Sequence, residues 1–283
     1  MKAKRIPGSV RIFQFERHGA PPDPSMGWLA AKNLFFTSHV PVTVLLIICG
    51  GFRLPSATAD DPPRHVIPRA STPITIDGRL DETSWNAVSG VGDFKFPWWE
   101  NGKKEQTVAK LLWDDTYLYV SYRCEDAHIW AEHTKRDSAV WMDDCVEVFI
   151  APNPDQPDNY FNIEMNVRGA FLDQHHPDGP ETETTEEWNA AGIKIATRID
   201  GTLNDDRDRD QSWTLEAAIP FKNFRSVARH APPKPGDVWH LNLNRLGGKT
   251  NPQFSQWSPS QTEEPQFHAP RDFGRVVFSD RSK

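Results

Sequence analysis

Cysteine is scarce in this chain of 283 residues, which contains three cysteines and no Cys-x-x-Cys pair. Structural zinc sites are usually built from such paired thiolates, so the sequence predicts no zinc centre of this kind. Two of the cysteines, Cys124 and Cys145, lie within the predicted domain. This pair fits a disulfide in an oxidising compartment, and it fits two buried thiols as well. The sequence leaves that choice open.

Positive charge is also in short supply, because 32 lysines and arginines stand against 39 aspartates and glutamates, for a net charge of −7. A nucleic-acid-binding surface needs clustered basic side chains to neutralise phosphates. The sequence therefore predicts no nucleic-acid partner. The charged turn at residues 204–210 lacks the glycine and the closing glutamate of an EF-hand loop. Calcium binding there is left open, and no metal-ligating residue is predicted.

Long apolar segments are missing as well. The main apolar run, residues 40–52, is shorter than the ~20 residues that a membrane-spanning helix needs. Basic residues precede this run and Ala57-Thr58-Ala59 follows it, which is typical of a signal peptide cleaved before Asp60. We therefore predict a secreted or periplasmic protein with no stable membrane span. Residues 1–59 form its N-terminal lead, in which Met26 is a second candidate start.

What the sequence does contain is about ten short runs in which apolar and polar residues alternate, separated by turns rich in proline and glycine. No run is followed by a long helical pattern. This combination predicts an all-β, antiparallel two-sheet β-sandwich of the jelly-roll kind over residues 74–283, after a short lead-in at 60–73. The predicted strands cover residues 74–78, 106–113, 117–125, 145–150, 160–167, 169–173, 193–199, 212–219, 238–244, 255–257 and 273–278. Short helical turns are expected at 80–88 and 220–224.

The stretch at residues 140–150 combines an aromatic loop with a strand. Val146, Val148 and Ile150 alternate with Cys145, Glu147 and Phe149, so the two sets are expected on opposite faces. The preceding loop places Trp141 beside Asp143 and Asp144. An indole next to carboxylates can stack on the apolar face of a sugar ring while its hydroxyls are hydrogen-bonded. The alternative is a core tryptophan with solvated carboxylates.

The remaining aromatic residues divide into two groups. Trp85, Trp113, Trp213 and Trp239 occupy apolar-periodic positions and are expected in the core. In contrast, Trp98, Trp99, Trp141 and Phe267 fall in loops. Aromatic side chains on the loops of a rigid sandwich are typical of a binding site.

Other chemistries are less well supported by the residues. The carboxylates Asp143, Asp144, Glu147 and Glu164 include candidates for the acid and base of glycoside hydrolysis. Met165 and the histidines are candidate haem ligands, but Met165 shares the apolar face of its strand, which favours core packing. Asp173 and the pair His175-His176 are expected on a loop surface, with the two histidines on opposite faces. A scaffold or adhesion domain without a small ligand is a third alternative.

Five segments, taken in order, resemble the family 9 carbohydrate-binding modules and their DOMON-like β-sandwich relatives. They are Ile76-Asp77-Gly78-Arg79-Leu80-Asp81-Glu82 with Trp85, the hairpin at 108–120, Trp141 to Ile150, Trp213 to Ile219, and Phe273-Gly274. The resemblance spans nearly all of residues 74–279. It implies an antiparallel β-sandwich with a sugar slot between two aromatic rings. Many members of the family accompany glycoside hydrolases, and some relatives bind haem.

The resemblance also assigns roles to individual residues. Trp141 matches the first stacking tryptophan, and Asp144 and Glu147 match the hydrogen-bonding carboxylates. Asn166 resembles part of the same polar wall, and Glu164 stands where the family can place an arginine. Phe267 replaces the second stacking tryptophan, a loss for which Trp98, Trp99 or His268 could compensate. We therefore predict a carbohydrate-binding module without catalytic residues or cofactor, whose partner is a poly- or oligosaccharide and which supports polysaccharide degradation.

Overall fold

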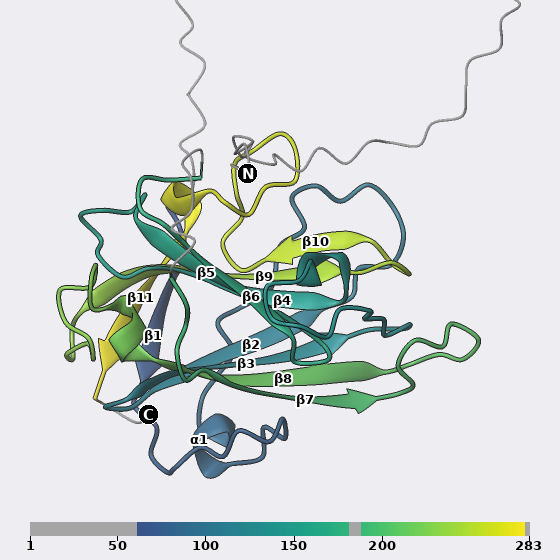
Figure 1. Ribbon diagram of the computed structural model, residues 1–283, viewed down its shortest axis with the longest axis horizontal. Coiled ribbons are helices and arrows are strands. Elements are labelled where there is room, and N and C mark those ends of the chain that lie inside the picture. Colours follow the sequence, from purple (N-terminus) through teal and green to yellow (C-terminus); the bar gives the residue numbers. More distant parts are fainter. Residues whose placement is uncertain (1–60, 181–187, 281–283) are drawn as a thin grey trace, which may run out of the picture. The chain divides into compact units, whose positions relative to one another are not determined.

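The computed structural model describes residues 61–180 and 188–280, so the predicted signal peptide and residues 181–187 lie outside the described residues. Two β-sheets pack face to face as two layers (Figure 1). The predicted all-β sandwich is confirmed.

The larger sheet has the strand order β1-β11-β9-β4-β5-β6, with β10 also paired to β9. Its strands are β1 (Arg64–Pro68), β4 (Cys145–Ala151), β5 (Tyr160–Asn166), β6 (Phe171–His176), β9 (Val238–Gly247), β10 (Gln253–Gln256) and β11 (Gly274–Ser279). The smaller sheet has the order β2-β3-β8-β7, formed by Thr107–Trp113, Tyr117–Glu125, Ser212–Pro220 and Lys194–Asp200. Neighbouring strands are antiparallel except β1 and β11, which are parallel.

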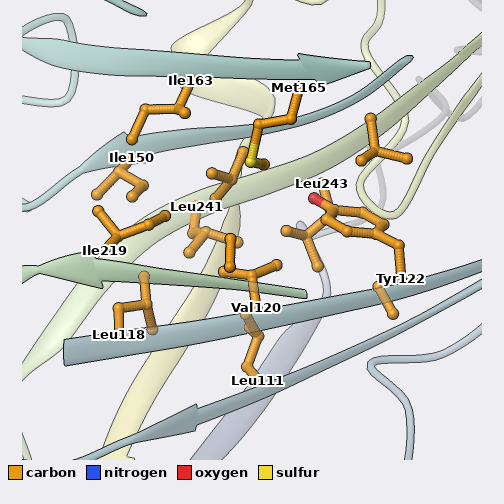
Figure 2. Packing of buried hydrophobic residues seen from close by; sticks show 14 of the residues in the cluster. Leu111, Leu118, Val120, Tyr122, Ile150, Ile163, Met165, Ile219, Leu241 and Leu243 are labelled. Atoms are coloured by element: carbon orange, nitrogen blue, oxygen red, sulfur yellow. The ribbon is translucent and has the colours of Figure 1, made fainter. Parts of the chain in front are cut away.

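The main core lies between the sheets, because each strand turns every second side chain inward. Val146, Val148 and Ile150 of β4 are fully buried there, as the alternation predicted. Figure 2 shows side chains of the larger sheet, including Ile163 and Met165, packed toward those of the smaller sheet. The predicted core position of Met165 is confirmed. The four tryptophans expected in the core are also buried, each at most 2% exposed: Trp85, Trp113, Trp213 and Trp239.

The N-terminal part of the fold differs from the prediction. The predicted lead-in at 60–73 contains β1, whose backbone pairs with β11 and whose Ile67 is fully buried. Residues 74–78, predicted as a strand, form no ladder. Instead, the Asp77 and Gly78 amides donate to the buried carboxylate of Glu216, which also accepts from the Trp85 indole. A side chain thus satisfies the backbone donors that a sheet partner would have taken.

The helical elements are short and serve as connections. They are α1 (Thr83–Asn86) and the 3₁₀ turns Val140–Met142, Phe221–Phe224 and Pro270–Asp272. Within residues 61–180 and 188–280 no helix has the length and apolar character needed to cross a membrane. Cys124 and Cys145 are both buried and free, so the disulfide that the sequence left open does not form.

Candidate functional site

The outer face of the larger sheet, turned away from the main core, carries a row of polar side chains. In the ladder, Glu147 of β4 lies directly opposite Glu164 of β5 on one side and Asn244 of β9 on the other. Gln256 of β10 continues the line beyond Asn244. We call these four residues the polar row. Cys145, Glu147 and Phe149 all share this outer face, as the alternation predicted.

Glu147 and Glu164 form a buried carboxyl pair, with exposed fractions of 3% and 6%. The outward positions of β4, β5, β6, β9 and β10 hold no lysine or arginine, and neither glutamate takes part in an ion pair among the described residues. Burial and the charge of Glu164 raise the pKa of Glu147 well above its usual range. Burial, partly offset by a hydrogen bond from Asn162, raises the pKa of Glu164 to about 7. The pair therefore retains a proton near neutral pH.

Amide side chains orient the two carboxyl groups. Asn244 Nδ2 donates to Glu147 Oε2 at 3.3 Å, and Asn162 Nδ2 donates to Glu164 Oε1 at 2.9 Å. Asn162 Oδ1 in turn lies 3.0 Å from His176 Nε2, which must carry the proton of that bond. Of the buried polar atoms without a hydrogen-bond partner among the described residues, three lie on this outer face: Glu164 Oε2, Asn244 Oδ1 and His176 Nδ1. Asn244 Oδ1 and His176 Nδ1 are acceptors, and Glu164 Oε2 accepts when its carboxyl group is ionised, so a hydrogen-bond donor placed on this face would satisfy them.

Aromatic side chains pack on the same outer face as the polar row. Trp98, Trp141 and Phe254 are partly buried against an outer cluster that includes Phe149, Tyr160, Phe267 and Phe273. Trp98 packs on Phe267 with 5.8 Å between ring centroids, and its indole nitrogen donates to the Thr262 carbonyl at 2.9 Å. Phe267 is only 7% exposed. Of this pair, Trp98 is therefore the ring with the larger accessible surface.

His268 reaches the same face, whereas Trp99 does not contact it. His268 Nδ1 lies 2.8 Å from the Tyr160 hydroxyl, and its ring centroid is 4.7 Å from that of Phe149. Burial lowers the pKa of His268 to about 4, so its ring is neutral at physiological pH. Trp99 packs instead on Phe96 at 5.8 Å, with Lys104 Nζ 5.4 Å from its ring.

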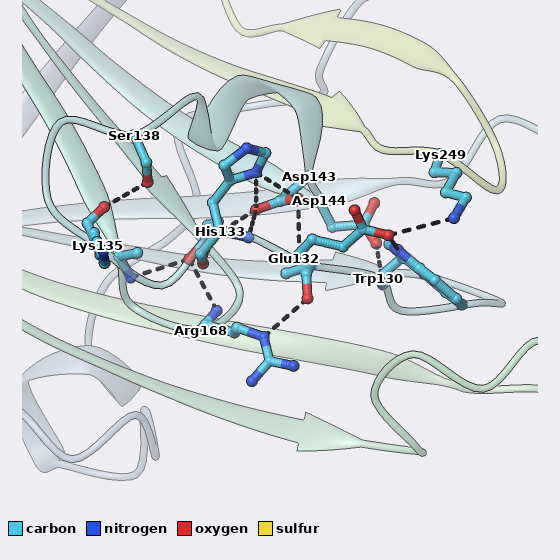
Figure 3. A network of polar contacts seen from close by, with 12 residues as sticks. Trp130, Glu132, His133, Lys135, Ser138, Asp143, Asp144, Arg168 and Lys249 are labelled. Carbon is cyan, nitrogen blue, oxygen red and sulfur yellow. Dashed lines mark hydrogen bonds and ion pairs between the residues drawn. The ribbon is translucent and has the colours of Figure 1, made fainter.

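Two predicted ligand-binding residues, Asp144 and Asn166, make their hydrogen bonds within the protein. Asp144 accepts hydrogen bonds from the backbone amides of Trp130 and Gly248. Asn166 donates to Asp143 and to the His133 carbonyl, and its oxygen accepts from two backbone amides. Figure 3 shows the loop around His133 held by Asp143. These two residues anchor that loop, since their polar atoms are already paired within the chain.

The sequence analysis did not name Asn162 or Asn244 as site residues, and it misplaced His176. Asn162 lies between the apolar residues Phe161 and Ile163, an alternation that indicates the outer face. The signal is weaker for Asn244, which lies between Leu243 and Arg245. His175 and His176 were predicted on a loop surface, but they belong to β6. Their predicted opposite orientation is confirmed, because His175 stacks on Phe161 of the main core while His176 stacks on Tyr160 of the outer cluster.

The charged turn at 204–210 is held together by its own contacts. Asn204 exchanges two hydrogen bonds with the Ala131 backbone, Asp210 accepts from the amides of Ile129 and Thr202, and Asp205 pairs with Arg207. Across the part of the chain that the structure describes, no three histidine, cysteine, aspartate or glutamate side chains gather closely enough to hold a metal ion. The calcium site that the sequence left open stays untested.

Comparison with known proteins adds a family match. The model of the family described as carbohydrate-binding family 9 matches residues 81–278. Endo-1,4-beta-xylanase C of Paenibacillus barcinonensis is 29% identical over 164 residues, which cover 58% of this chain and 13% of that protein. Exoglucanase XynX of Acetivibrio thermocellus is 29% identical over 154 residues, which cover 54% of this chain and 12% of that protein. The chain thus spans about an eighth of the length of these relatives.

Solved structures share the fold. A protein from Bacteroides uniformis superposes with a TM-score of 0.66 at 22% identity, over 77% of this chain and all of that one. A family 9 carbohydrate-binding module from Caldicellulosiruptor kristjanssonii in complex with cellotriose has a TM-score of 0.53 at 17% identity. That match covers 77% of this chain and 94% of the module.

Proposed function

The chain belongs to carbohydrate-binding family 9, and we propose that it binds an oligo- or polysaccharide on the outer face of its larger sheet. The observation that carries the proposal is the polar row, whose buried acceptors Glu164 Oε2 and Asn244 Oδ1 have no partner among the described residues. Sugar hydroxyls donate hydrogen bonds and would satisfy such acceptors. The solved module in complex with cellotriose and the similarity to two polysaccharide-degrading enzymes support this ligand class.

Aromatic contacts would supply the apolar half of the interaction. Trp141 and Trp98 are partly buried against the outer cluster, which lies on the same face as the polar row. A sugar lying on this face would place its C–H surface on an indole and its hydroxyl edge toward the carboxyl pair. Each stacked ring is expected to contribute about 0.5–1.5 kcal/mol beyond its buried area. The affinity for one short oligosaccharide should therefore be in the micromolar to millimolar range.

The geometry favours binding over hydrolysis. Glycosidases place their two carboxyl groups on either side of the scissile bond. Glu147 and Glu164 are direct cross-strand neighbours on one face of a sheet, so they approach a bound sugar from the same side. We therefore assign both glutamates to hydrogen bonding. We also propose that the protein is secreted, on the basis of the signal-peptide pattern before Asp60.

Calorimetric titration with a panel of glucose-, xylose- and glucosamine-based oligosaccharides tests the proposal. Trp141→Ala should weaken binding of the best ligand by roughly tenfold or more, through loss of stacking and of buried area. Trp99→Ala is the matched control, because Trp99 packs on Phe96 and Lys104 within its own loop, and it should bind like the wild type. The proposal fails if no oligosaccharide binds, or if both variants bind as the wild type does.

A further inference from the structure

The polar row combines two buried carboxyl groups that have no positively charged partner among residues 61–180 and 188–280. The amide donors that reach the pair come from Asn244 and Asn162, and each satisfies one oxygen. Glu164 Oε2 and Asn244 Oδ1, which belong to the two strands on either side of Glu147, have no partner among the described residues although both residues are at least nine-tenths buried. Such a site offers hydrogen-bond acceptors and negative charge to a ligand. Its own amide groups are neutral and do not balance that charge.

We propose that the polar row selects amino sugars, and that it holds the primary ammonium group of a glucosamine-type unit between Glu147, Glu164 and Asn244. The inference rests on the proposed carbohydrate-binding function and specifies the sugar class. An ammonium group has three N–H donors and a full positive charge, so it can pair with both carboxylates and with the Asn244 oxygen. A hydroxyl at the same carbon brings one donor and no charge. An acetylated amine likewise brings one donor and no charge, and it adds bulk.

The charge of the pair makes the selection pH-dependent. The groups that face the pair are Cys145 on β4, His176 on β6 and His268 from the loop before β11, while β9 and β10 contribute only neutral side chains. Burial keeps both histidines neutral, because it lowers the pKa of His176 to about 3 and that of His268 to about 4. Burial also raises the pKa of the Cys145 thiol, which stays protonated. Of these groups, Glu164 is therefore the one whose pKa, raised by burial to about 7, lies near neutral pH.

Binding of the ammonium would release the proton that the pair shares. Below a pH of about 7 a larger fraction of the free protein carries this proton. The cation must then displace the proton, so the affinity of the protein for the amino sugar falls. A neutral sugar makes no such exchange. The preference for the amino sugar should therefore shrink as the pH is lowered from about 7 to about 5.

Three trisaccharides matched in backbone test the inference by calorimetry on the full chain: the glucosamine trimer, its N-acetylated form and cellotriose. They differ only at carbon 2, which carries an ammonium, an acetamide or a hydroxyl group. At about pH 7 the glucosamine trimer should bind roughly tenfold more tightly than cellotriose, the effect of one favourable close charge contact. Glu164→Gln, which keeps shape and removes charge, should abolish most of this preference. Glu263→Gln, an exposed carboxylate on a loop, should keep it.

The outcomes separate the two proposals. If cellotriose or the acetylated trimer binds as tightly as the glucosamine trimer, the amino-sugar inference is overturned while carbohydrate binding stands. If none of the three trisaccharides binds, and no oligosaccharide of the wider panel binds, both the amino-sugar inference and the proposed carbohydrate binding are overturned. A preference that persists in Glu164→Gln, or that is unchanged in the wild type between about pH 5 and about pH 7, also overturns the inference. The pH comparison needs no variant and so does not depend on how well Glu164→Gln folds.

Discussion

At the scale of single residues, the outer face is defined by how its buried polar atoms are paired. Asp144 and Asn166 have their hydrogen bonds satisfied within the chain, whereas Glu164 and Asn244 each keep an acceptor without a partner. The sequence analysis assigned Asp144, Asn166 and Glu164 to one candidate site and did not single out Asn244. Only the hydrogen-bond pairing of each atom separates the residues that anchor the loop from those that keep an atom without a partner among the described residues.

Because the pKa of Glu164 is raised, we predict that the free energy of unfolding decreases as the pH rises. Folding shifts this pKa from its ordinary value of 4.5 to about 7, so between those values the folded protein binds more protons than the unfolded chain. The free energy of unfolding should therefore decrease as the pH rises through that window, by on the order of 3 kcal/mol from this group. Glu164→Gln should flatten the slope, measured by urea unfolding at several pH values. An unchanged slope in the variant would contradict the buried pair.

Asn166 should behave as a structural residue. Asn166→Ala removes donors to Asp143 and to the His133 carbonyl and leaves buried backbone amides without their acceptor. The free energy of unfolding should fall by about 2–4 kcal/mol, as measured by urea denaturation. Sugar affinity at a temperature where the variant remains folded should change much less than it does in Trp141→Ala. Normal stability combined with lost sugar binding would instead place Asn166 in the ligand site.

At the scale of elements, the sequence predicted most strands because alternation and turns are local signals. The hairpin at 106–125 and the strand at 145–150 correspond closely to β2, β3 and β4. The N-terminal errors have a common physical cause. β1 exists because β11 lies beside it, and residues 74–78 are held by Glu216, so both outcomes depend on distant partners. The local pattern of apolar and polar residues does not indicate such distant partners.

The inclusion of β1 in the sandwich can be tested by one pair of substitutions. Ile67 is fully buried in the main core, while Val66 on the same strand is 45% exposed. Ile67→Ala should lower the free energy of unfolding by about 2–4 kcal/mol through lost burial and a new cavity. Val66→Ala should stay within about 0.5 kcal/mol of the wild type. Equal effects in thermal or urea unfolding would show that β1 does not pack as described.

At the scale of the whole molecule, the sequence predicts the architecture but not the register in which distant strands pair. Composition, alternation and the family resemblance predicted the sandwich, the sugar class of ligand, and Trp141 with Glu147 as site candidates. The neighbours of Glu147 depend on which residues of β5 and β9 lie opposite it, and a shift of one residue would replace Glu164 and Asn244 with core side chains. That long-range pairing explains why Asn244 was missed. Phe267 was expected as an open platform and is buried against Trp98, because the loops fold onto this face.

The central claim is that carbohydrate binds on the outer face of the larger sheet, and the tryptophan indole signals test it most directly. In a titration followed by ¹H–¹⁵N NMR, the indole N–H resonances of Trp141 and Trp98 should shift progressively as the best oligosaccharide saturates the protein. Those of the buried Trp85, Trp113, Trp213 and Trp239 should stay in place. Saturable binding that leaves Trp141 and Trp98 unmoved while other indole signals shift would contradict the account.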